Sequence, residues 1–111
     1  MRDERVNAVP EPQGESPPGW TFLTHHARVL LEIARDPEVR LRDIAATIGI
    51  TERTVQGVVN DLHEAGYLGR ERVGRRNIYT LNPDRHFRYP TESGIAVRHL
   101  IEIFTKRRRP A

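Results

Sequence analysis

Three side chains that can pair with nucleic-acid bases recur along one stretch of this 111-residue sequence. Arg53, Gln56 and Asn60 are three and four positions apart, a spacing that places residues on one face of an α-helix. Arginine can donate two parallel hydrogen bonds to guanine, and glutamine or asparagine can pair in the same way with adenine. An ordinary exposed helix carries Glu/Lys pairs instead. The pattern therefore indicates a helix face that reads base edges.

A glycine lies on the same face. Gly57 costs about 1 kcal/mol relative to alanine inside a helix, and on an outer face no packing contact accounts for it. Close approach of the helix to a nucleic-acid backbone would account for it. We therefore include Gly57 in the predicted contact surface.

A helix-turn-helix pattern over residues 41–60 positions this face. Ala45 lets a second helix come close, Gly49 can take the left-handed conformation that closes the first helix, and Val55 fills the angle between the two. Thr51 can cap the second helix by accepting an N–H of its first turn. The apolar residues of the second helix fall opposite its polar face, and they are Val55, Val58, Val59 and Leu62.

With these residues in view, residues 24–81 resemble a winged helix-turn-helix transcriptional regulator of the broad kind to which the MarR and ArsR groups belong. The segments IAATIGIT, TVQGVVNDLHEAGYL and RERVGRRNIYTL carry the resemblance. It implies a mainly α fold with a small β-hairpin, the wing. It also implies a regulator that binds double-stranded DNA as a homodimer, with a recognition helix over residues 51–65 in the major groove.

The wing is predicted over residues 67–81, as two strands joined across Gly74 and Arg75. Between positions 69 and 88 there are six arginines and two acidic residues, so positive charge is concentrated on the wing and its exit. Charge on a hairpin edge can simply protect it against aggregation. Two arginines at the tip, beside a recognition helix, favour contact with the DNA backbone or minor groove instead.

The predicted DNA contacts come from the second helix and the wing, and they are Thr51, Arg53, Thr54, Gln56, Gly57, Asn60, Arg70, Arg72, Arg75 and Arg76. Two alternatives stay open. One is a winged-helix module that binds protein and no nucleic acid, although such a module would more often expose aromatic or aliphatic anchors on this face. The other is a ligand-responsive or metal-responsive sensor on the same fold, and the sequence names no effector.

Two further helices are predicted to hold a dimer together. One runs from a cap at Thr24 to about Arg35, where Asp36 and Pro37 stop it, and the other opens at Thr91 or Ser93. Both are apolar over too wide an arc for one small domain to cover, which predicts a homodimer. The predicted interface consists of Val29, Ile33, Val97, Leu100, Ile101 and Phe104.

Composition agrees with a single small domain flanked by tails. Eighteen Lys and Arg residues against fifteen Asp and Glu residues give a formal charge of +3, and the sequence pI is about 9.9. The predicted segments are a proline-rich disordered tail over 1–19, the winged helix-turn-helix domain over 20–90, a C-terminal dimerisation helix over 91–105 and a basic tail over 106–111.

The sequence offers few residues suited to metal binding or catalysis. The sequence has no cysteine, so disulfides and thiolate metal sites are excluded, including the cysteine-based metal sensing found in part of the ArsR group. Its five histidines form no dense ligand cluster, and it has no nucleophile elbow or phosphate loop, so we predict no metal, no cofactor and no enzymatic activity. No signal peptide or membrane span is evident, which predicts a cytoplasmic protein without a membrane partner.

Overall fold

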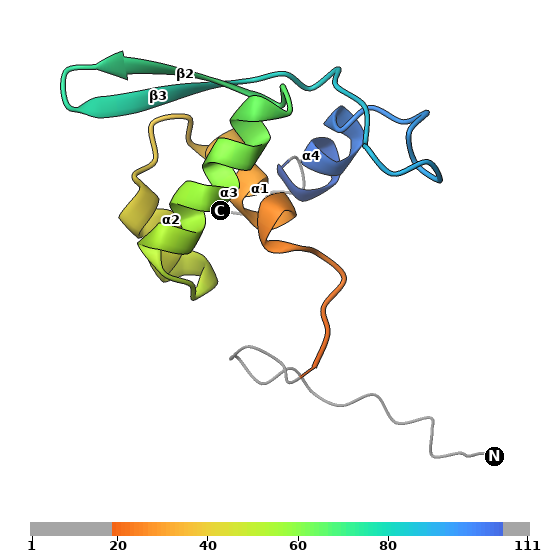
Figure 1. Ribbon diagram of the computed structural model, residues 1–111, viewed down its shortest axis with the longest axis horizontal. Helices are drawn as coiled ribbons and strands as arrows, with labels where there is room; N and C mark the ends of the chain where they lie inside the picture. The colour runs from red at the N-terminus through yellow and green to blue at the C-terminus, as the bar shows by residue number, and fades with distance from the viewer. Residues whose placement is uncertain (1–18, 106–111) are drawn as a thin grey trace.

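A computed structural model describes residues 19–105 as a helical domain with one β-hairpin (Figure 1). The elements in chain order are α1 (His25–Arg35), α2 (Leu41–Ile48), α3 (Glu52–Glu64), β2 (Leu68–Val73), β3 (Arg76–Leu81) and α4 (Arg98–Thr105). This arrangement confirms the predicted winged helix-turn-helix architecture. The N-terminal tail predicted over 1–19, except for its last residue, and the basic tail predicted over 106–111 lie outside the described residues.

α1 is the central helix of the domain, and it packs against α2, α3 and α4. It begins as predicted, because the Thr24 hydroxyl accepts a hydrogen bond from the N–H of Ala27 at 3.0 Å. It ends at Arg35, since Asp36 takes an extended conformation ahead of Pro37. A helix in contact with three others must be apolar on most of its circumference, as its sequence is.

The turn between α2 and α3 has the predicted chemistry. Gly49 has a φ of +79°, and its N–H donates to the carbonyl of Ala45 at 2.8 Å, which closes α2. Thr51 caps α3 by accepting from the N–H of Thr54. Val55 is fully buried between the two helices. Local sequence therefore fixes the angle at which α3 leaves the turn.

The wing is an antiparallel hairpin whose register pairs Leu68 with Leu81. Gly74 supplies the positive φ of +64° that the tight turn requires. Tyr79 is buried on the inner face, and its N–H donates to the carbonyl of Pro37 at 2.9 Å. The hairpin is thus tied to the α1–α2 connection as well as to α3.

α4 begins later than the sequence predicts. The prediction that Thr91 or Ser93 opens the last helix is wrong, because the first helical residue is Arg98. Residues 91–94 form turns. The Ser93 hydroxyl donates to the carbonyl of Pro90 at 3.3 Å and caps no helix.

The connection between β3 and α4 folds back on itself, which explains the late start of α4. The N–H of Phe87 donates to the carbonyl of Ile95 at 3.0 Å, and the N–H of Val97 donates to the carbonyl of Arg85 at 2.9 Å. These bonds satisfy backbone groups that a longer helix would have satisfied internally. Pairing between distant residues has therefore displaced a local helical preference.

An ion pair marks the start of α4. The Arg98 guanidinium donates to the Asp84 carboxylate, and this hydrogen bond raises the pKa of Arg98. Both side chains are exposed, so the pair positions the helix start and adds little stability.

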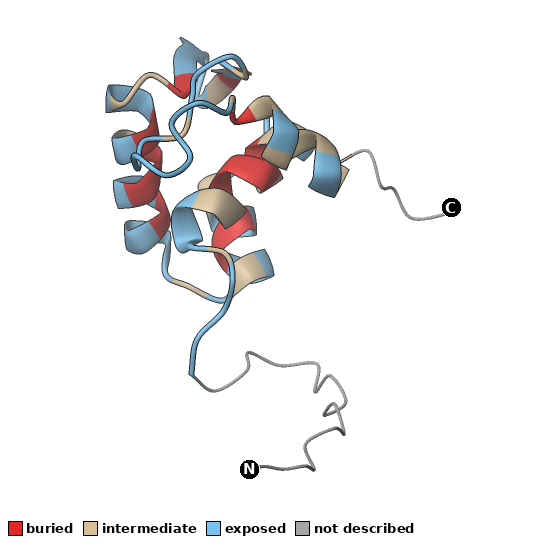
Figure 2. Cartoon of the chain, turned by 90° about the vertical axis from the view of Figure 1, so that its right-hand side faces the viewer, coloured by how far each residue is buried: buried red, intermediate tan, exposed pale blue. Residues whose placement is uncertain are grey.

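The core lies where the inner faces of the helices meet beneath the wing (Figure 2). Its largest fully buried side chains are Ile33, Ile44, Val29, Val55 and Val59. Three residues of the predicted dimer interface belong to this core. Val29 and Ile33 are 0% exposed and Val97 is 4% exposed within a single chain, so they hold the monomer together and offer no surface to a partner.

Candidate nucleic-acid interface

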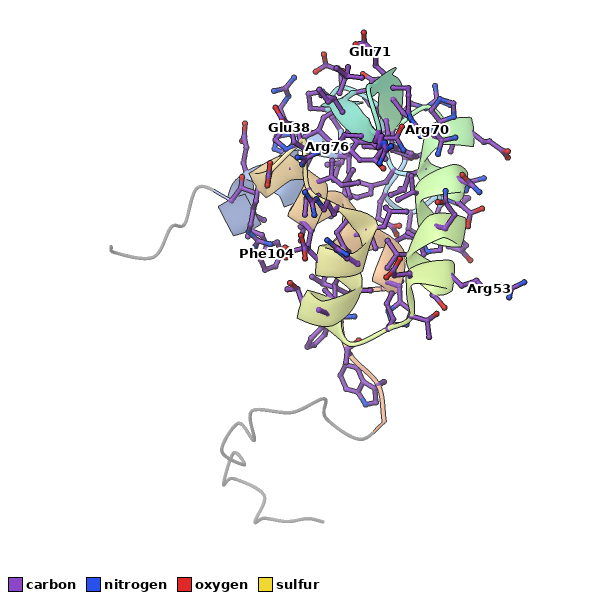
Figure 3. The ribbon with its side chains drawn as sticks, turned by 90° about the vertical axis from the view of Figure 1, so that its left-hand side faces the viewer. Glu38, Arg53, Arg70, Glu71, Arg76 and Phe104 are labelled. Atoms are coloured by element: carbon purple, nitrogen blue, oxygen red, sulfur yellow. The ribbon has the colours of Figure 1, made fainter. Side chains whose placement is uncertain are left out.

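The outer face of α3 carries the polar residues that the sequence singles out. Arg53 projects from the first turns of α3 into solvent (Figure 3). Gln56 and Gly57 are exposed, and Asn60 is half-buried near the wing. The apolar side of α3 faces the core, so tertiary packing holds the polar face outward.

The two threonines at the start of α3 bond to each other. The Thr51 hydroxyl accepts from the N–H of Thr54 at 3.1 Å and donates to the Thr54 hydroxyl at 2.9 Å. Both residues are exposed beside Arg53. The first role of Thr51 is therefore to cap the helix that presents the other residues.

A side-chain cluster joins α3 to the wing. The Oδ1 of Asn60 accepts a hydrogen bond from Nε2 of Gln56 at 3.1 Å and a second from Nη1 of Arg70 at 3.1 Å. Arg70 lies on β2, where the hairpin leaves α3 (Figure 3). We call these three residues the Asn60 cluster. The sequence suggests each member separately, but it does not reveal that they meet.

The arginines of the wing point in different directions. Arg72, Arg75 and Arg76 are all exposed. The Nε of Arg72 donates to the carbonyl of Gly74 at 3.2 Å, so this side chain lies along the tip. The Nη2 of Arg76 donates to the carbonyl of Glu38 at 2.6 Å and is turned toward the α1–α2 connection (Figure 3). Arg76 therefore also anchors the wing to the domain.

Packing does not require the glycine on α3. In the described part of the chain, no heavy atom other than those of the adjacent residues and the surrounding helix backbone lies within 4 Å of the position that a Cβ would occupy at Gly57, and the residue has no positive φ. Alanine would fit there without a clash. Neither packing nor backbone conformation within the described residues therefore requires glycine at this position.

A pocket of about 440 Å³ opens between α1, α3 and α4. Its walls are mainly apolar and include Leu30, Leu62 and Val97. His26 and Asp61 close one side, with His26 Nε2 2.8 Å from Asp61 Oδ2. This volume is in the range that holds small organic molecules. No local motif marks it in the sequence, because residues distant in the chain form it.

Residues 19–105 offer neither a metal cluster nor a membrane-spanning helix. Within that range, no three side chains of His, Cys, Asp or Glu lie close enough together to hold a metal ion. The described helices include none that is long and apolar enough to cross a membrane.

Comparison with known protein families agrees with this geometry. A family model described as MarR family matches residues 20–76, just over half of the chain. The matched region runs from the segment before α1 to the first residue of β3, so it contains α3 with its polar face and all four arginines of the wing. A search of curated proteins finds no match. The chain belongs to the MarR family of DNA-binding, winged helix-turn-helix transcriptional regulators.

Proposed function

We propose that the protein is a homodimeric regulator that binds a short pseudo-palindrome in double-stranded DNA. In this proposal α3 enters the major groove, where Arg53, Gln56 and Asn60 meet base edges. The wing lies against the backbone or minor groove through its arginines. The observation that carries the proposal is the continuous polar surface formed by the outer face of α3 and the base of the wing, joined by the Asn60 cluster.

The distribution of exposed apolar side chains supports DNA over protein as the partner of α3. In the described part of the chain, the exposed large hydrophobic residues are Trp20, Phe22, Val73, Tyr89, Ile95, Ile103 and Phe104. None of them is on α3. Protein interfaces are usually centred on aromatic or aliphatic anchors, whereas DNA interfaces are polar and positively charged.

The surface of α4 supports self-association. Ile103 and Phe104 are 56% and 40% exposed, and they follow the half-buried Leu100 and Ile101 along the same short helix. Contiguous exposed apolar residues at the end of a domain are typical of an interface. We propose that α4 pairs with its copy about a two-fold axis, which makes the contact isologous. Of the predicted interface residues, Leu100, Ile101 and Phe104 remain in this proposal.

We expect the arginines of the wing tip to contribute affinity without sequence preference. Replacing Arg72 and Arg75 by alanine should weaken binding to all duplexes alike, because phosphate contacts carry no sequence information. The slope of log affinity against log salt should become shallower by about one unit for each phosphate that the variant no longer touches. Fluorescence anisotropy with a labelled duplex at several salt concentrations measures this slope.

Arg88→Ala is the matched control for the wing variants. Arg88 is an exposed arginine in the connection between β3 and α4. This connection lies at the opposite end of the domain from the wing tip (Figure 1). It changes the net charge by the same amount per residue and should leave the slope unchanged. A slope that is the same in the double variant as in the unmodified protein would remove the wing tip from the interface.

Gly57→Ala should have opposite effects on folding and on binding. It should stabilise the free protein by about 1 kcal/mol, since alanine is the better helix former and its methyl group meets open space. The same methyl group should weaken DNA binding if the α3 backbone approaches the duplex closely. Thermal unfolding and duplex titration of the same sample measure both effects. Higher stability with unchanged affinity would contradict the proposed position of α3 in the groove.

A further inference from the structure

The hydrogen bonds of the Asn60 cluster determine which atoms α3 can offer to a base. Asn60 Oδ1 accepts from Gln56 Nε2 and from Arg70 Nη1, each at 3.1 Å. A carbonyl oxygen of this type has two lone pairs, so these two bonds use its accepting capacity. The remaining hydrogen-bonding group of Asn60 is its Nδ2 amide, which can only donate.

The orientation of the Asn60 amide follows from the chemistry of arginine. A guanidinium carries donors and no acceptor, so the atom of Asn60 that faces Arg70 must be the oxygen. The atom of Gln56 that faces this oxygen must then be its nitrogen. Arg70 therefore fixes both amides, although it lies ten positions from Asn60 and on the wing.

We propose that Arg70 is a positioning residue that sets the base preference of α3 by holding Asn60 as a pure donor. This inference rests on the proposed function, in which α3 reads the major groove. An asparagine that reads adenine bidentately needs both its oxygen and its nitrogen, and here the oxygen is engaged. Asn60 should thus select a base edge that presents acceptors, which is guanine with its O6 and N7.

Gln56 keeps a different reading capacity. Its Oε1 can accept and its Nε2 has a second N–H, so Gln56 retains both groups that bidentate pairing with adenine requires. The cluster therefore predicts two different purine preferences on one helix face, adenine at the position read by Gln56 and guanine at the position read by Asn60.

Selection of bound duplexes from a random library tests this assignment. The position read by Asn60 is the one that loses its preference in Asn60→Ala. At that position Arg70→Met should move the preference from guanine toward adenine by about tenfold, because the freed amide can present its oxygen. Arg70→Lys again places a group with donors and no acceptor beside Asn60, so it should restore the preference for guanine at this position.

Arg72→Met is the matched control, since it removes the same charge from the same strand and its guanidinium bonds to Gly74 rather than to Asn60. It should lower affinity without changing the preferred sequence. If Arg70→Met behaves like Arg72→Met, Arg70 is a phosphate contact only and the inference is overturned. If the unmodified protein enriches no sequence at all, the proposed function fails and the inference fails with it.

A second measurement needs no DNA. The side-chain NH₂ resonances of Asn60 in the free protein should shift in Arg70→Met and stay in place in Arg72→Met, since Arg70 bonds to this amide and Arg72 bonds to the carbonyl of Gly74 instead. Thermal unfolding confirms that both variants are folded. Unchanged Asn60 resonances in a folded Arg70→Met variant would show that Arg70 does not hold the amide.

Discussion

Replacing Ile103 and Phe104 together by glutamate should give a folded monomer that binds a duplex with two half-sites at least about a hundredfold more weakly. These side chains are the most exposed apolar residues of α4, whereas Leu100 packs against the core of its own chain. In the variant each chain would bring two glutamates to the same isologous contact. Like charges that are buried against one another prevent the two chains from pairing. A dimer gains its affinity from simultaneous engagement of two half-sites, so loss of the dimer removes about 10²–10⁴ of affinity without touching α3. Light scattering and duplex titration measure the two effects.

Tyr89→Glu is the control for the α4 variant. Tyr89 is 67% exposed in the connection before α4, so its replacement adds the same kind of charge to an exposed position outside α4. It should remain dimeric. A finding that the unmodified protein is a monomer at micromolar concentration, with or without DNA, would mean that α4 packs only against its own domain. The proposed homodimer would then be wrong.

Arg53→Ala and Gln56→Ala should each cost about 1–3 kcal/mol of binding free energy and relax the preference at particular base pairs. Both side chains are exposed on α3 and neither belongs to the core, so the fold should be unaffected. The two losses should differ in character. Arg53 also contributes charge and should reduce the salt dependence, whereas Gln56 is neutral and should not.

Competition between the preferred duplex and single-base variants measures these preferences. Arg88→Ala, which removes an exposed charge far from the wing tip, serves again as the control and should leave them intact. Unchanged affinity and base preference in both α3 variants would mean that this face does not read DNA.

Local sequence predicted the helix-turn-helix and the wing because short-range chemistry specifies them. Gly49 and Gly74 supply positive φ angles at the two turns. Thr51 caps α3 by accepting a hydrogen bond from the N–H of Thr54, three residues further on. The helical periodicity of apolar and polar residues on α3 was likewise sufficient to assign its inner and outer faces. These features depend on residues within a few positions of one another.

Features that depend on distant residues were missed or predicted wrongly. The start of α4 was placed too early because Phe87 and Ile95 bond across the preceding connection, which no helical pattern reveals. Val29 and Ile33 were assigned to a dimer surface because periodicity shows that a face is apolar but not which partner covers it. Here helices of the same chain cover them.

The candidate DNA-binding site also combines features that the local sequence predicted with features that it did not. Its residue types were evident from the spacing on α3 and the arginines of the wing. Two hydrogen bonds were not evident from the sequence, the one from Arg70 to Asn60 and the one from Arg76 to the carbonyl of Glu38. The second of them joins residues 38 positions apart. Both bonds form only after the hairpin has packed beside the helices, so tertiary structure decides which arginines are free to meet DNA.

Selection from a random duplex library with the unmodified protein tests the central claim most directly. The protein should enrich a pseudo-palindrome whose half-sites are about one helical turn, or a multiple of it, apart, since two-fold symmetry sets the spacing of the two α3 helices. Affinity for the enriched site should exceed affinity for random duplex by about 10³ or more at the same salt concentration. A library that remains random after several rounds, or enrichment of an unpaired half-site alone, would contradict a homodimer that reads DNA through α3.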